Sequence, residues 1–244
     1  MSVLTSRIAK IPAATWSRSR LFIFRRPFSE DSALASKNDV DLQNIPDYLH
    51  FHENFDSDLM KKIIFSMKIY PNFISQAEEE SIFAEIQPYL KRLRYEFDHW
   101  DDAIHGYRET EKLKWNEANT KIIDRLRGIA FPPGTSQLAH VHVLDLDAKG
   151  VIKAHIDSVR FCGSTIAGIS LLSNSVMRLV NDKKKDQIVD IFLQQRSMYT
   201  MKDNARYDYT HEILSEENSF FKGEKVPRSR RISVICRNEP LADM

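Results

Sequence analysis

Two histidines and one aspartate have the residue types and the spacing of a metal site. His155 and Asp157 are separated by one residue, and on an extended chain such residues point to the same side, so an imidazole and a carboxylate converge. His-x-Asp alone is a common and weakly specific pattern. His211 follows 56 residues later, a separation over which a β-barrel brings a late strand back beside an early one. Two histidines and one carboxylate form a facial triad, which suits iron(II).

The segment Arg231-Ile-Ser-Val-Ile-Cys-Arg237 is a second candidate site. Arg231, Ser233 and Arg237 occur at even offsets, so on a strand they share one face, whereas Cys236 points to the other face and is expected to pack. Two arginines on the inner wall of a barrel need anions, and a dicarboxylic acid supplies them through charge-assisted hydrogen bonds. The alternative interpretation is an edge strand with its polar face in water.

Four other histidines carry weaker signals. His140 and His142 alternate as a ligand pair would, but no carboxylate follows at a suitable spacing, so a second metal site is not expected. His99 and His105 lie in a charged, aromatic segment, 95–115, which either lines a substrate entrance or wraps the barrel. Wrapping is the favoured interpretation.

Periodicity predicts two helices ahead of these residues. Ser75-Gln-Ala-Glu78 forms a capping box for a helix that runs through Leu90, in which Pro88 predicts a kink. A second helix is expected over 116–130, and Phe131-Pro-Pro-Gly134 ends it.

After Gly134 the sequence becomes a series of short segments rich in β-branched and aliphatic residues. Six of them are expected to be strands: 140–146, 166–172, 176–180, 188–193, 197–201 and 231–237. Turn-prone residues such as Gly150 and Gly163 separate several of them, as in a β-sandwich or barrel. The predicted fold class is therefore α+β, mainly β.

Composition limits the class of protein. The chain has 244 residues, of which 42% are hydrophobic and 28% charged, so it holds one large globular domain or two small ones. With 7 Gly and 9 Pro it is neither collagen-like nor wholly disordered. No run of 18 apolar residues exists, so no membrane span is expected. Two cysteines are too few for a disulfide framework and favour a reducing compartment.

The N-terminal region has a distinct charge. Residues 1–29 hold six basic residues and no acidic one, which leaves 29 basic against 34 acidic residues in the rest. A basic, Ser-rich, acid-free start is typical of a mitochondrial presequence. Arg26-Pro27-Phe28-Ser29 also resembles a matrix-protease cleavage site. The alternative is a basic arm that binds nucleic acid.

Three further boundaries follow from composition. Residues 30–58 are acidic and polar, which indicates a linker or an arm that Tyr48, Phe51 and Phe55 anchor. The folded domain is expected over 59–238, followed by a tail over 239–244.

Taken together, the motifs resemble the AlkB family of iron(II)- and 2-oxoglutarate-dependent dioxygenases. The resemblance lies in His-x-Asp, a distant His and Arg-x-Ser-x-x-x-Arg, and in segments such as Ile152-Lys-Ala-His-Ile-Asp-Ser158 that are similar to a mitochondrial branch of the family. It covers about residues 70–238 and implies a double-stranded β-helix (jelly-roll) core.

The resemblance also implies a role for each candidate residue. His155, Asp157 and His211 would hold the iron. Arg231, Ser233 and Arg237 would bind 2-oxoglutarate, and Tyr199 either adds a hydroxyl to its distal carboxylate or is an aromatic of the barrel wall. The expected chemistry is decarboxylation of 2-oxoglutarate to succinate, coupled to hydroxylation of a C–H bond. On an N-methyl group the product releases formaldehyde, so the same chemistry demethylates.

The chain departs from the base-repairing members of the family at three positions. Those members carry Asn-x-Tyr ahead of the metal motif, where this chain has Leu144 and Leu146, and an acid two residues after the metal aspartate, where it has Val159. These departures and the acidic charge of the mature chain weaken a nucleobase substrate.

The sequence therefore predicts a dioxygenase of the mitochondrial matrix that hydroxylates a protein side chain. One alternative is N-demethylation of mitochondrial RNA, such as tRNA. Another is a binding module that senses 2-oxoglutarate or iron with little turnover. DNA is not an expected partner. The resemblance to the mitochondrial branch further implies links to fatty-acid metabolism and to necrotic death after alkylation damage.

Overall fold

The computed structural model describes residues 44–97 and 103–240. The predicted presequence, His99 and most of the C-terminal tail lie outside these residues. The helices are α1 (Ser57–Ser66), α2 (Gln76–Leu90), α3 (Glu117–Ala130), α4 (Asp203–Tyr207) and the 3₁₀ turn η1 (Glu216–Asn218). The strands are β1 (Leu49–Phe51), β2 (Met67–Tyr70), β3 (Ile104–Lys112), β4 (Val141–His155), β5 (Thr165–Leu171), β6 (Ser175–Asn181), β7 (Ile188–Leu193), β8 (Met198–Lys202), β9 (Tyr209–Ile213), β10 (Phe220–Phe221), β11 (Glu224–Lys225) and β12 (Arg231–Arg237). None of the helices described is long and apolar enough to cross a membrane.

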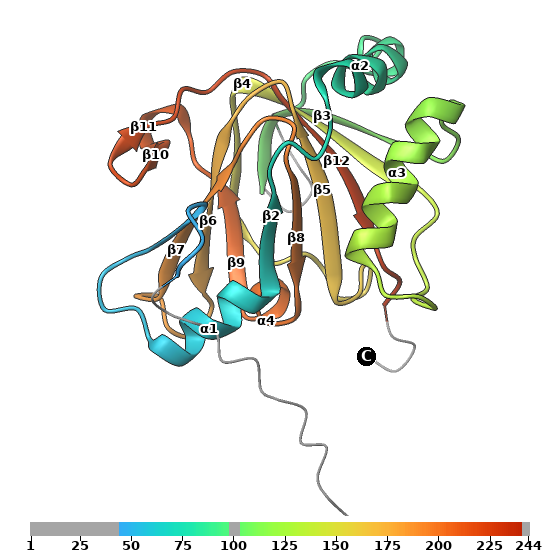
Figure 1. The fold of residues 1–244 in the computed structure, drawn as a ribbon. Coiled ribbons are helices and arrows are strands. Elements are labelled where there is room, and N and C mark those ends of the chain that lie inside the picture. Colours follow the sequence, from blue (N-terminus) through green and yellow to red (C-terminus); the bar gives the residue numbers. More distant parts are fainter. Residues whose placement is uncertain (1–43, 98–102, 241–244) are drawn as a thin grey trace, which may run out of the picture. The chain divides into compact units, whose positions relative to one another are not determined.

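Ten strands form one curled antiparallel sheet (Figure 1). Its order is β1-β7-β6-β9-β4-β12-β5-β8-β2, and β3 pairs with β4 beside this path. The long strand β4 is where the sheet turns: its first residues pair with β12, and its last residues pair with β9. The sheet therefore has two limbs that meet at β4: β12, β5, β8 and β2 form one, and β9, β6, β7 and β1 form the other. A fold made mostly of strands, with a few helices, confirms the predicted α+β, mainly β class.

The alternation of side chains on each strand divides the apolar residues between two cores. On β12, Ile232, Val234 and Cys236 pack outward against α2 and α3, whereas Ile235 belongs to the core between the two limbs. Arg231, Ser233 and Arg237 share the inward face with Ile235. Cys236 is thus a packing residue, as expected.

The predicted helices begin where their caps indicate. The Ser75 hydroxyl accepts a hydrogen bond from the Glu78 N–H, and the Glu78 carboxylate accepts one from the Ser75 N–H, which completes the capping box of α2. Asn116 caps α3. Pro88 lies within the last turn of α2, which ends two residues later.

Strand β4 is longer than predicted, because Gly150 does not end it. A Cβ at this position would lie 2.5 Å from the carbonyl oxygen of Gly106, so glycine lets the bulged strand β3 approach closely. As a result β4 continues to His155 and carries the first candidate metal ligand at its end. β3 itself was not predicted as a strand, because its second half is charged and polar and has no apolar alternation.

Secondary structure begins before Leu59, where composition places the start of the domain. β1 pairs with β7, and Tyr48, Phe51 and Phe55 pack against the inner core. The described part of the segment 30–58 therefore contains a docked strand, anchored by the aromatics that the sequence singles out.

Candidate active site

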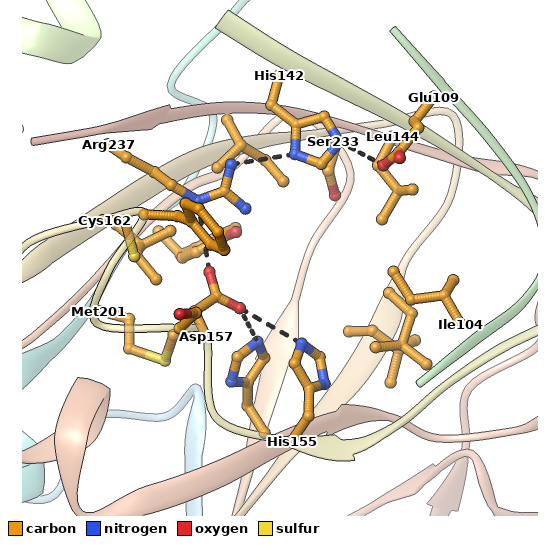
Figure 2. A pocket seen from close by; sticks show the side chains of 18 of the residues that line it. Ile104, Glu109, His142, Leu144, His155, Asp157, Cys162, Met201, Ser233 and Arg237 are labelled. Atoms are coloured by element: carbon orange, nitrogen blue, oxygen red, sulfur yellow. Dashed lines mark hydrogen bonds and ion pairs between the residues drawn. The ribbon is translucent and has the colours of Figure 1, made fainter. Parts of the chain in front are cut away.

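A cavity of about 510 Å³ lies between the two limbs of the sheet. All seven residues that the sequence analysis selects for the iron and 2-oxoglutarate sites line it. They are His155, Asp157, Tyr199, His211, Arg231, Ser233 and Arg237. Figure 2 shows its polar side, where carboxylate, imidazole and guanidinium groups converge.

The three candidate metal ligands meet although they come from different parts of the fold. β4 and β9 place His155 opposite His211, with ring centroids 4.3 Å apart. Asp157 follows in the loop after β4, and its Oδ1 lies 3.3 Å from His155 Nε2 and 3.6 Å from His211 Nε2. One ligand atom from each residue lies within 4.8 Å of the others. In the part of the chain that the structure describes, no other group of three such side chains does so.

Hydrogen bonding and burial prepare these groups for a cation. His155 Nδ1 donates to the Lys153 carbonyl oxygen at 2.8 Å, which leaves Nε2 as the lone-pair nitrogen. Burial lowers the pKa of His211 to about 4, so this imidazole is neutral at physiological pH. Burial opposes ionisation of Asp157, but the imidazoles beside it and the charge of Arg237 hold its pKa well below the usual range.

Arg231 is a buried cation at the inner end of β12. Its side chain is 2% exposed, and its Nη2 donates to Ser170 Oγ at 3.2 Å. The Nε has no hydrogen-bond partner, and no carboxylate of the described residues forms an ion pair with Arg231. Burial lowers the pKa of Arg231 to about 10, so the guanidinium remains charged. A buried cation with no anionic partner among the described residues suits a carboxylate ligand.

Arg237 occupies the opposite end of the same strand, beside the candidate metal ligands. Its Nε donates to Asp157 Oδ2 at 3.4 Å, and its Nη1 donates to His142 Nδ1 at 3.0 Å. His142 Nε2 in turn donates to Glu109 Oε2 at 2.8 Å. The dashed lines of Figure 2 follow this series of contacts. The carboxylate partner of His142 comes from β3, an earlier strand, and sequence spacing gave no signal for that pairing.

Tyr199 lies on β8 directly opposite Gly168 of β5. A Cβ at Gly168 would come within 2.6 Å of the Tyr199 ring, so the glycine provides the space that the phenol occupies. Burial raises the pKa of Tyr199, which keeps the hydroxyl protonated and able to donate.

The three positions at which the chain departs from the base-repairing pattern are apolar. Leu144 lines the cavity, Leu146 is buried in the inner core, and Val159 lies in the loop after β4 with 42% of its surface exposed. In the described part of the segment 95–115, β3 adds a strand beside β4, and its Glu109 and Glu111 line the cavity.

The sequence matches a known protein family over most of the cavity-forming part of the chain. Residues 99–237, more than half of the chain, match the family model described as the 2OG-Fe(II) oxygenase superfamily. The chain belongs to this superfamily. The oxygenase is 52% identical over 185 residues to the mouse protein named alpha-ketoglutarate-dependent dioxygenase alkB homolog 7, mitochondrial, a match that covers 76% of this chain and 84% of that protein. It is 54% identical to the cattle protein of the same name over 70% of this chain and 78% of that one.

A solved structure agrees with the fold. The structure of OsALKBH1 superimposes on the oxygenase with a TM-score of 0.50 at 14% identity, over 70% of this chain and 97% of that one. The likeness supports the predicted jelly-roll core.

Family membership identifies the oxygenase as an enzyme that uses Fe(II), 2-oxoglutarate and dioxygen. The residues of the cavity suit these groups. Two imidazoles and a carboxylate are the donor set that iron(II) accepts. The partnerless Nε of the buried Arg231 suits a carboxylate of the co-substrate.

Proposed function

We propose that this oxygenase hydroxylates an aliphatic C–H bond of a protein side chain in the mitochondrial matrix. In this proposal His155, Asp157 and His211 hold the iron. Arg231 binds the distal carboxylate of 2-oxoglutarate with help from Ser233 and Tyr199, and Arg237 lies near the chelating end. Bound iron and 2-oxoglutarate couple decarboxylation of the co-substrate to insertion of one oxygen atom into the substrate.

The charge of the cavity wall favours a protein substrate over a nucleic acid. Its cations, Arg231 and Arg237, are both assigned to the co-substrate, and no described lysine lines it. Two carboxylates that line the cavity, Glu109 and Glu111, repel a phosphate backbone. Val159, which stands where the base-repairing members carry an acid, offers no hydrogen bond to a base edge.

The cofactor site is tested by anaerobic titration with Fe(II) and 2-oxoglutarate. The metal-to-ligand charge-transfer absorbance of the chelate should appear with the wild type, be lost in His155→Ala and weaken in Arg231→Ala. A folded wild-type protein that gives no absorbance would contradict the assignment of these residues.

The substrate class is tested by adding mitochondrial peptides or mitochondrial RNA to the loaded enzyme under ¹⁸O₂, with His155→Ala as the inactive control. We expect peptides to stimulate succinate formation and to gain one labelled oxygen atom. Formaldehyde released only with RNA would instead establish N-demethylation. Binding of 2-oxoglutarate with no stimulation by either would favour the sensing role.

The location and the physiological role belong to the same proposal. The mouse and cattle relatives are named mitochondrial, and the basic N-terminus supports import into the matrix. The family-implied links to fatty-acid metabolism and necrosis are testable in cells whose only copy carries His155→Ala. Such cells should show altered fatty-acid oxidation and altered survival after an alkylating agent.

A further inference from the structure

The loop ligand Asp157 presents its two oxygens to different partners. Oδ1 faces the Nε2 atoms of both histidines, and Oδ2 accepts from Arg237. A carboxylate held in this way offers one oxygen to a metal, because the guanidinium occupies the other. The orientation of Arg237 therefore decides which oxygen of Asp157 faces the histidines.

The orientation of Arg237 depends on His142. Arginine carries donors only, so His142 Nδ1 must accept its hydrogen bond, which places the imidazole proton on Nε2. That proton is donated to the Glu109 carboxylate. The carboxylate thus selects the tautomer of His142 that accepts from Arg237, as outer-sphere carboxylates do for histidines at metal sites.

The strand register makes this arrangement part of the fold. His142 on β4 lies opposite Ile235 of β12 and opposite Glu111 of β3. Glu109 and Arg237 are therefore its diagonal neighbours on the two flanking strands, on the face that lines the cavity. The side chains of His142 and Arg237 are 18% and 21% exposed, whereas that of Glu109 is 40% exposed.

We propose that His142 and Glu109 are positioning residues of this oxygenase, which hold Arg237 against Asp157 and so fix the carboxylate as a one-oxygen metal ligand. This inference rests on the proposed metal site. It assigns a function to a histidine that sequence spacing alone left without one. Neither residue touches the metal in this proposal.

The test measures the affinity for Mn(II) alone, from the electron paramagnetic resonance signal of the free ion, so that no turnover is needed. His142→Ala should weaken binding about tenfold, as loss of an outer-sphere partner typically does. In His142→Asn the side-chain oxygen takes the place of Nδ1 and accepts from Arg237, so this variant should recover most of the affinity. Equal weakening in both variants would overturn the proposal, because His142 would then only fill space.

A double-mutant cycle tests whether His142 affects Mn(II) affinity through Arg237. In an Arg237→Gln background, His142→Ala should weaken Mn(II) binding no further, since His142 acts through Arg237. The same loss in both backgrounds would refute this route. Glu109→Gln should weaken binding in the same direction, whereas Glu111→Gln, which removes a neighbouring charge of the same cavity, should not.

Two controls separate this inference from the proposed function. His140→Ala changes an exposed histidine two residues away and should leave Mn(II) affinity unchanged. His155→Ala should abolish binding. If it does and His142→Ala has no effect, only the positioning role fails. If His155→Ala binds Mn(II) as the wild type does, the metal site itself is wrong.

Discussion

Arg231 brings a positive charge into the protein interior, and among the described residues no carboxylate neutralises it. Such a charge destabilises the empty protein and is compensated when an anion binds. Arg231→Met should therefore leave the metal-free, co-substrate-free protein as stable as the wild type or more stable. The same change should raise the Kd for 2-oxoglutarate roughly 10- to 100-fold, the equivalent of a lost charged hydrogen bond.

Calorimetry with and without 2-oxoglutarate measures both effects. The exposed Arg160 provides the control, and Arg160→Met should change neither quantity. Unaltered 2-oxoglutarate affinity in Arg231→Met would show that the co-substrate is held elsewhere.

His211 gives the metal-free protein a defined response to acid. Its pKa is about 4 in the folded protein because of burial, against about 6.5 in an unfolded chain. Between these values the unfolded chain binds a proton that the folded protein does not, so stability rises with pH. This contribution is complete above about pH 6.5 and should be lost as pH falls toward about 4. Urea unfolding across this range should show the loss, and His211→Gln should reduce it; an identical pH slope in the variant would contradict the assignment.

Strands β5 and β8 set the position of the Tyr199 phenol through one small residue. A methyl group at position 168 would overlap the ring, and backbone hydrogen bonds on both sides fix the strand. Gly168→Ala should destabilise the protein by about 1–3 kcal/mol, as overpacking does, and should weaken 2-oxoglutarate binding. The measurements are chemical denaturation and co-substrate titration.

A glycine elsewhere in the fold provides the matched control. A Cβ at Gly128, inside α3, would meet nothing within 4 Å, so Gly128→Ala should stabilise by about 0.5–1 kcal/mol. Tyr199→Leu should relieve the effect of Gly168→Ala. Destabilisation that persists in the double variant would mean that the backbone at position 168, and not the ring, cannot tolerate a side chain.

The elements were predictable from the sequence where the local pattern also determines the structure. The capping box of α2 and the alternation of β12 are such cases, because each depends on residues close in sequence. The extension of β4 through Gly150 depends on the close approach of β3, and β3 in turn depends on pairing with β4. The local sequence of either segment therefore did not predict its strand. His155, Asp157 and His211 were predictable as a group from their motif and from the family resemblance. The hydrogen bond between His142 and Glu109 was not, because it depends on how strands β3 and β4 are paired.

The N-terminal boundary of the folded unit lies before Leu59, because residues ahead of it pack against the rest of the domain. A chain that begins at Leu59 loses β1, the packed aromatics Tyr48, Phe51 and Phe55, and the Asp56 side chain that caps α1. Burial of three aromatics, even in part, contributes at least about 2 kcal/mol. This chain should therefore unfold at a clearly lower temperature than one that begins at Asn44.

Asp56→Ala in the longer chain isolates the contribution of the cap, about 1 kcal/mol. Equal unfolding temperatures for the two starting points would support a domain that begins at residue 59.

The last strand of the described residues, β12, lies in the middle of the sheet, where it joins β4 to β5. Ser233 pairs with Leu144 and Ser170, residues made much earlier. Pairings between such distant segments form slowly, and a growing chain exposes the edges of β4 and β5 until its C-terminal part is made. Folding of this protein is therefore expected to depend on chaperones that shield those edges. A premature stop before Arg231 would remove the centre of the sheet together with both arginines, so a shortened chain could not retain partial activity.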